Sequence, residues 1–167
     1  KYWLERYARI PVEIDIASEF RYREPPLRKG GLAVFISQSG ETADTLAALR
    51  LAKEGGYLSS LAVCNVPESS LVRESELVML TRAGPEIGVA STKAFTSQVT
   101  VLTLIALLLG RMRRTSPDEG MKICKALNKI PDQIREILLL NDQIKTIAGE
   151  IKDHSNFLFL GRGYNYP

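Results

Sequence analysis

The sequence predicts an α/β fold in which a parallel sheet is flanked by helices. Three short apolar runs, at residues 33–36, 60–64 and 77–80, alternate with segments of helical periodicity. Strand, helix and strand at this spacing favour parallel strands joined by right-handed crossovers. The run at 33–36 contains no polar residue, which is typical of a strand that is covered on both faces.

Two further strands are expected near the ends of the chain. Residues 11–16 alternate with a period of two, and residues 156–160 form a short apolar run before Gly161 and Gly163. A strand that leads into a glycine turn usually opens another βα unit. Because the helix of that unit does not follow in the sequence, and residues 2–7 have the pattern of a helix interior, we expect a fragment of a longer polypeptide.

Helical patterns fill most of the remaining sequence. Residues 42–54 have helical spacing, and two glycines end the pattern. Two amphipathic helices are predicted after residue 118, the second beginning near Pro131 because proline suits the first turn of a helix, and a last helix is predicted at 142–152. A long apolar helix is predicted at 91–111, and we expect it to be buried at Val99, Leu102, Ile105 and Leu109.

Length and composition indicate one globular domain and exclude several classes of protein. The 167 residues are 45% hydrophobic and 25% charged, which is ordinary for a folded domain. The net charge of +3 is too small to indicate a nucleic-acid partner. The longest apolar stretch, residues 99–109, is shorter than the roughly 20 residues of a membrane span, so we expect no membrane segment.

The few cysteine and histidine residues argue against a disulfide framework or a metal site. Cys64 and Cys124 lie far apart and form no CxxC motif, so a reducing cytoplasm is the expected compartment. His154 is the single histidine, which leaves no set of histidine ligands for zinc.

The most informative segment for function lies between the run at 33–36 and the helix at 42–54. Ser37, Gln38, Ser39 and Thr42 supply neutral hydrogen-bond donors, and Gly40 permits a positive φ. A helix start offers free backbone N–H groups and the positive end of the helix dipole, so the segment suits a phosphate monoester. No GxxxxGK[ST] or GxGxxG motif is present. In the alternative interpretation, Thr42 is only an N-cap and the serines only form a turn.

A second candidate segment lies at residues 86–95. Gly88 loosens a turn, and Ser91 or Thr92 could cap the long helix. Lys93 would oppose the helix dipole, which indicates a nearby anion or acid. Glu86 has no evident partner in the sequence. The alternative is an ordinary capped helix with a solvent-exposed lysine.

Four segments together resemble one enzyme family. Residues 37–45 resemble the phosphosugar-binding loop of sugar isomerase (SIS) domains. With residues 16–23, 64–74 and 86–96, they resemble the glucosamine-6-phosphate synthase family, the glutamine–fructose-6-phosphate aminotransferases. The resemblance implies a three-layer SIS-type fold, with residues 1–150 as a first SIS subdomain that is incomplete at its N-terminus. Residues 151–167 would be the linker end and the opening strand of a second SIS subdomain.

The resemblance also implies a function and a set of site residues. The family converts fructose 6-phosphate and glutamine to glucosamine 6-phosphate and glutamate, with no cofactor or metal. It has a glutaminase domain in the same polypeptide and forms homodimers. The residues that match its phosphate site are Ser37, Gln38, Ser39 and Thr42, and those that match the sugar end are Val89 and Ser91. The family's catalytic groups match positions after Pro167, so we expect no catalytic residue in this segment.

Two other functions stay open. The chain could belong to a sugar-phosphate sensor with an SIS domain, or to another isomerase or deaminase that acts on amino-sugar phosphates. Sequence on either side would distinguish them, because a sensor of this kind often carries a DNA-binding helix-turn-helix domain.

Overall fold

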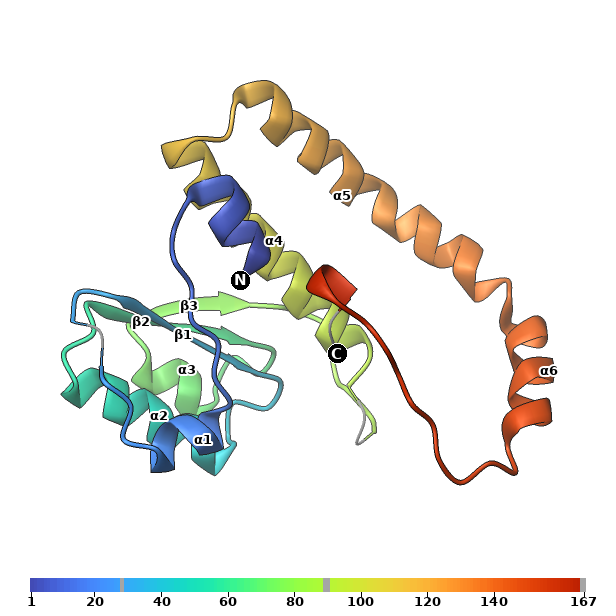
Figure 1. The fold of residues 1–167 in the computed structure, drawn as a ribbon, viewed down its shortest axis with the longest axis horizontal. Helices are drawn as coiled ribbons and strands as arrows, with labels where there is room; N and C mark the ends of the chain where they lie inside the picture. Colours follow the sequence, from blue (N-terminus) through green and yellow to red (C-terminus); the bar gives the residue numbers. More distant parts are fainter. Residues whose placement is uncertain (28, 89–90, 166–167) are drawn as a thin grey trace. The chain divides into compact units, whose positions relative to one another are not determined.

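The computed structural model describes residues 1–27, 29–88 and 91–165, which form two compact units (Figure 1). One unit is Val12–Ala106, and the other combines Lys1–Pro11 with Leu107–Pro167. The candidate residue Val89 lies outside the described residues.

The unit Val12–Ala106 contains the predicted parallel sheet. Its strands are β1 (Leu32–Ser37), β2 (Ser59–Cys64) and β3 (Leu77–Leu80), in the order β1-β2-β3. Val34 lies opposite Leu61, which lies opposite Leu77, and both strand pairs are parallel. The three apolar runs are therefore confirmed as strands, and the α/β prediction with a helix-flanked sheet is confirmed with them.

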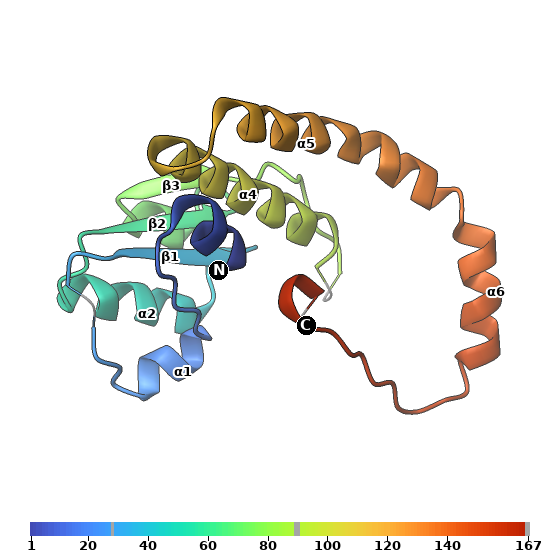
Figure 2. The ribbon, with the colours of Figure 1, turned by 45° about the horizontal axis from the view of Figure 1, so that its top comes forward.

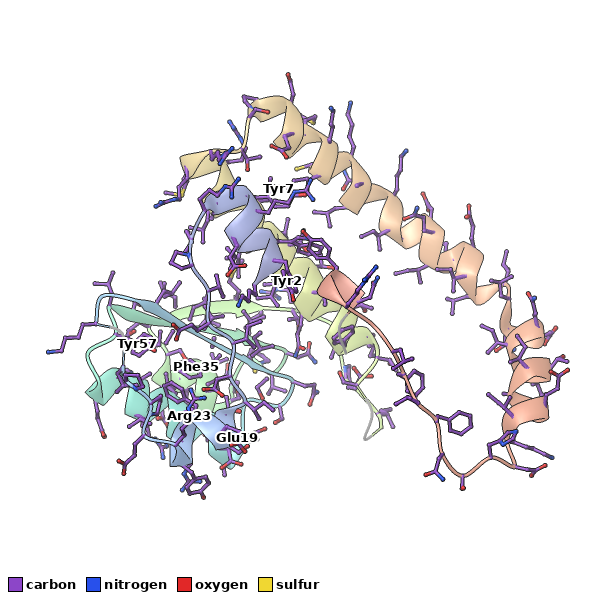
Figure 3. The ribbon with its side chains drawn as sticks, viewed as in Figure 1. Tyr2, Tyr7, Glu19, Arg23, Phe35 and Tyr57 are labelled. Atoms are coloured by element: carbon purple, nitrogen blue, oxygen red, sulfur yellow. The ribbon has the colours of Figure 1, made fainter. Side chains whose placement is uncertain are left out.

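Helices α2 (Ala43–Glu54) and α3 (Ser70–Glu74) cover one face of this sheet, as Figure 2 shows for α2. The core beneath them consists of Leu49, Ala62, Cys64 and Leu71, all fully buried, and Phe35 packs against it (Figure 3). On the other face, the edge strand β1 exposes 44%, 39% and 46% of Leu32, Val34 and Ile36. The expectation that this strand is covered on both faces is therefore wrong for the described chain.

The strand predicted at residues 11–16 is wrong. The structure has no strand there; Ile14 and Ile16 are 71% and 70% exposed, and α1 (Ala17–Tyr22) follows directly. The Asp15 carboxylate accepts hydrogen bonds from the Ile16 N–H at 3.0 Å and from Arg23 at 2.5 Å. The Ile16 N–H is thus bonded to a side chain instead of to a neighbouring strand.

The second unit is helical. It contains the turn η1 (Leu4–Ala8), the end of α4 (Lys93–Arg113), α5 (Pro117–Leu138), α6 (Asn141–Ile151) and the short η2 (Gly163–Asn165). The helices predicted at 91–111 and 142–152 are confirmed in kind, with ends shifted by one or two residues. Ser116 caps α5, because its Oγ accepts a hydrogen bond from the Glu119 N–H at 3.2 Å.

The predicted break near Pro131 is wrong, because α5 continues through this residue. Proline removes one helical hydrogen bond, but its φ is compatible with a helix. The apolar positions before and after Pro131 also fall on one stripe, which includes Met121, Cys124, Leu127, Ile134 and Leu138.

The strand predicted at residues 156–160 does not form in the described chain. Leu158, Phe159 and Leu160 are 84%, 80% and 86% exposed, and no strand pairs with them. A strand requires a neighbour for its hydrogen bonds, and the described residues supply none here. The division into two SIS subdomains stays a prediction.

Helix α4 is partly buried along its length. Ile105 is buried, whereas Val99, Leu102 and Leu109 are half-buried. The helix has 21 residues, and an 18-residue stretch of it has a mean hydropathy of 1.5. In this stretch 22% is buried. It is thus long and apolar enough to cross a membrane, which the count of uninterrupted apolar residues overlooked. Core helices of globular proteins meet the same criteria, so the absence of a membrane segment stays a prediction.

Candidate functional site

Three loops follow the carboxyl ends of the strands in the unit Val12–Ala106, and two of them contain candidate site residues. One joins β1 to α2 and contains Ser37–Thr42, and the other joins β3 to α4 and contains Glu86 and Ser91. In parallel α/β sheets, ligands bind at the carboxyl ends of the strands. We therefore compare the donors that each loop leaves free.

Serine side chains build the turn at Ser37–Thr42. The Ser37 Oγ accepts a hydrogen bond from the Gly40 N–H at 2.9 Å, and the Ser39 Oγ accepts one from the Glu41 N–H at 3.2 Å. Gly40 has φ +70°, as its predicted role requires. The serines thus form the turn, as the alternative interpretation holds, but each hydroxyl keeps its own hydrogen to donate to a ligand.

Residues that follow β2 donate hydrogen bonds to the backbone of this turn. The Leu71 N–H donates to the Gly40 carbonyl at 3.0 Å, and the Asn65 N–H donates to the Gln38 carbonyl at 3.3 Å. A Cβ atom on Gly40 would lie 2.1 Å from the Ser69 Oγ and 2.8 Å from the Cys64 Sγ. The turn is therefore packed tightly against β2 and α3, and glycine is required by both its φ and its surroundings.

The start of α2 has free backbone donors. Thr42 is at the N-cap position, as in the alternative interpretation, but its exposed side chain makes no capping hydrogen bond. Of the residues that the structure describes, none accepts a hydrogen bond from the N–H groups of Thr42, Ala43 or Asp44. The Asp44 carboxylate is paired with Arg21 at 3.1 Å, which offsets its negative charge in this first turn. The start of α2 can therefore accept an anion.

The start of α3 is occupied by a carboxylate of the chain itself. The Glu41 Oε1 accepts a hydrogen bond from the Ser70 N–H at 2.7 Å. This hydrogen bond from the Ser70 N–H is the main reason why the pKa of Glu41 lies below its usual range.

The start of α4 is likewise occupied, by Glu86. Its Oε2 accepts a hydrogen bond from the Ala94 N–H at 2.8 Å, and its Oε1 accepts from the Thr92 Oγ1 at 3.1 Å and the Thr92 N–H at 3.4 Å. The Ala94 bond, with the Thr92 bonds and the charge of Lys93, holds the pKa of Glu86 below its usual range.

Three expectations about this second loop are thereby decided. Glu86 has partners, so the expectation that it has none is wrong. Lys93 is exposed, as the alternative interpretation holds, and its charge contributes only weakly to the lowered pKa of Glu86. The helix is capped by Glu86, not by the side chain of Ser91 or Thr92; Ser91 is exposed and directly precedes Thr92.

Asn65 is a site-forming residue that sequence reasoning missed. Its Nδ2 donates to the Gly84 carbonyl at 2.8 Å, and its Oδ1 accepts from the Ala83 N–H at 2.8 Å and the Thr81 Oγ1 at 3.0 Å. Because its backbone N–H also holds Gln38, Asn65 connects the two loops. An asparagine after a strand is a weak signal, since its partners lie 16 to 19 residues away.

Arg111, Arg113 and Arg114, at the end of α4, are the alternative place for an anion to bind. Arg113 donates to the Ala8 carbonyl at 2.8 Å, and Arg111 donates to the Thr115 carbonyl. A hollow of about 210 Å³ nearby is lined by Arg6, Tyr7, Arg9, Arg114, Thr115 and Glu119. Two of the three arginines thus have structural partners, and the hollow carries an acidic side chain. Among the described residues no cluster of His, Cys, Asp or Glu could hold a metal ion.

Comparison with known proteins gives consistent matches. Residues 1–108 match the sequence profile of the SIS domain. The whole chain is 53% identical to part of a glutamine–fructose-6-phosphate aminotransferase (isomerizing) from Photorhabdus laumondii and 56% identical to part of one from Bradyrhizobium diazoefficiens. It spans 27% and 28% of the length of these two relatives.

Solved structures show the same similarity. The C-terminal domain of glucosamine-fructose-6-phosphate aminotransferase from Francisella tularensis superposes on 98% of this chain with a TM-score of 0.94 and 45% identity. The chain covers 46% of that structure. A glucosamine-6-phosphate deaminase from Thermotoga maritima superposes on 72% of this chain and is covered over 37% of its own length, with a TM-score of 0.60 and 25% identity.

Proposed function

Because the chain belongs to the SIS domain family, we propose that it binds fructose 6-phosphate as part of a glutamine–fructose-6-phosphate aminotransferase. One observation carries the proposal: of the three helix starts after the strands, those of α3 and α4 hold the carboxylates of Glu41 and Glu86, whereas no carboxylate among the described residues accepts from the first N–H groups of α2. A phosphate monoester supplies the anion that this start lacks.

We assign the phosphate to the donors of the β1–α2 loop. The residues are Ser37, Gln38, Ser39 and Thr42, and the sugar end would meet Val89 and Ser91. Each hydrogen bond to a charged group contributes on the order of 1.5–3 kcal/mol. These donors are uncharged, so they hold the phosphate without the full positive charge of a lysine. Such binding suits a sugar phosphate that must dissociate after the reaction.

The reaction requires more protein than these residues. In the proposed aminotransferase, a glutaminase domain of the same polypeptide supplies ammonia from glutamine, and the isomerase part converts fructose 6-phosphate to glucosamine 6-phosphate. This chain would contribute phosphate binding and no catalytic residue. A homodimer and a cytoplasmic location are further parts of the proposal, supported by the similarity to the bacterial aminotransferases.

The second candidate is a deaminase or isomerase of amino-sugar phosphates, favoured by the likeness to the Thermotoga maritima deaminase. Its identity of 25% is lower than the 53% and 56% of the aminotransferases, which favours the first candidate. Assays of the full-length protein distinguish them. Glutamate formation from glutamine with fructose 6-phosphate identifies an aminotransferase, whereas ammonia release from glucosamine 6-phosphate alone identifies a deaminase. Binding without turnover identifies a sensor.

The site itself is tested in the full-length protein with Thr42→Val combined with Ser39→Ala. The loss of two charge-assisted bonds should weaken fructose 6-phosphate binding by roughly 3–6 kcal/mol, or less where water substitutes, and should raise KM. Ser116→Ala is the matched control, because it removes the hydroxyl cap of α5 and leaves the loop intact. An unchanged KM in the double variant would remove the loop from the site. A rise in KM on replacing Arg114 instead would favour the alternative anion site.

A further inference from the structure

We propose that Glu86 is a positioning residue for the sugar end of the site, because its carboxylate joins the β3–α4 loop to the start of α4 beside Ser91. The inference rests on the proposed function, in which Ser91 meets the sugar. It concerns a different set of contacts from those that hold the phosphate.

The geometry explains how Glu86 could fix its neighbour. One carboxylate oxygen is bonded to the N–H and the hydroxyl of Thr92, and the other is bonded to the Ala94 N–H. The Thr92 N–H belongs to the peptide group that Ser91 begins. A side chain that holds this group fixes the backbone on which the Ser91 hydroxyl is carried.

The loop before Glu86 is also fixed at its other end. Asn65 binds Ala83 and Gly84, so the chain that leads to Glu86 is attached to the end of β2. Asn65 in turn holds the Gln38 carbonyl of the phosphate loop. The distance between the phosphate donors and Ser91 is therefore set through Asn65 and Glu86.

The negative charge of the same carboxylate also offsets the partial positive charge at the start of α4, which would otherwise attract an anionic ligand. This carboxylate accepts hydrogen bonds from the Thr92 and Ala94 N–H groups at the start of the helix and lies near the charge of Lys93. An anionic substrate therefore gains nothing from the start of α4 and is directed to α2. Glu86 contributes to orientation in this way as well as through Ser91.

The test is the steady-state kinetics of the full-length protein with Glu86→Ala and Glu86→Gln. Misplacement of Ser91 removes binding that the substrate has before and during the reaction, so KM for fructose 6-phosphate should rise about tenfold with kcat within about twofold. Glu86→Gln keeps one oxygen acceptor and should rescue part of the loss. It also keeps the test open if Glu86→Ala does not fold.

Glu76→Ala is the matched control. Glu76 accepts hydrogen bonds from the Ser60 N–H at 2.5 Å and the Ser60 Oγ at 2.8 Å, at the amino end of β2, the opposite edge of the sheet. Glu76→Ala should lower the melting temperature of the protein and leave KM for fructose 6-phosphate unchanged. If it raised KM as much as Glu86→Ala, general loosening would explain the effect and the positioning role would be overturned.

Thr42→Val separates this inference from the proposed function. If Thr42→Val raises KM and Glu86→Ala leaves KM unchanged or lowers only kcat, the positioning role is overturned and the proposed phosphate site stands. If neither variant changes KM, the phosphate site and the inference built on it both fail.

Discussion

The starts of α2 and α4 both follow a strand of the same sheet, yet they differ in what occupies their N–H groups. The start of α4 is filled by Glu86, whereas no described residue fills the start of α2. The dipole and the free N–H groups of a helix start favour any nearby anion. The chain itself supplies that anion at α4, whereas at α2 no described residue does, so α2 is the start that favours a ligand.

The largest expected effect concerns catalysis by the 167 residues alone. Among the described residues of these loops, the carboxylates of Glu41 and Glu86 accept backbone hydrogen bonds and have lowered pKa values, so we expect neither to act as the base. Proton transfer between adjacent sugar carbons needs a positioned base, which contributes roughly 10²–10⁴-fold in rate. With fructose 6-phosphate and saturating ammonia, we expect at least about a hundredfold less glucosamine 6-phosphate than from the intact isomerase domain.

Turnover by the isolated chain within about tenfold of that domain would show that a catalytic base does lie in one of these two loops. The comparison between an open and a filled helix start would then be incomplete.

The next effect tests how firmly the α2 loop is built. Gly40→Ala should lower the free energy of unfolding by about 2–5 kcal/mol, since a positive φ and a collision with Ser69 both act against it. Gly30→Ala is the matched control: it has φ +75° with no atom within 4 Å, so it should cost only about 1–2 kcal/mol. Urea unfolding of both variants measures the difference, and equal losses would mean that Gly40 is not tightly packed.

A smaller effect compares the two occupied helix starts at low pH. Because the pKa values of Glu41 and Glu86 are lowered in the folded state, their stabilisation is present above the unfolded pKa and is lost as pH falls through the folded pKa. Glu41→Gln and Glu86→Gln should therefore lower stability near neutral pH and make stability fall less steeply as the pH drops below the ordinary pKa of glutamate.

Thermal unfolding across this range measures the slope, and Glu54→Gln, at the opposite end of α2, serves as the control. If the stability of Glu86→Gln fell with pH as steeply as that of the unsubstituted chain, the Glu86 carboxylate would not be held in the folded state.

The sequence predicted the sheet better than the ends of the chain. Continuous apolar runs at 33–36, 60–64 and 77–80 marked strands, because each has a neighbouring strand in the described residues. The alternating pattern at 11–16 and the apolar run at 156–160 have no such neighbour in the described residues, and a strand depends on its partner as much as on its own pattern. Pro131 shows the same limit, since a continuous apolar stripe outweighs one lost hydrogen bond.

The candidate site was predicted where its signal is local. The pattern of serines around Gly40, directly before a helix, indicated a turn and an anion site within six residues. The cap of α4 by Glu86 was missed because the acceptor lies eight residues before Ala94, outside the spacing of a capping box. The contacts of Asn65 were missed because the fold alone brings its partners together.

The most direct test of the central claim is an amide ¹H–¹⁵N titration of the chain with inorganic phosphate. We predict that the resonances of Thr42, Ala43 and Asp44 shift with increasing phosphate and that the resonance of Ala94 does not move. In Glu86→Ala the Ala94 resonance should begin to respond, because that N–H is then free. Shifts at Ala94 in the unsubstituted chain, or none at Thr42–Asp44, would contradict the account.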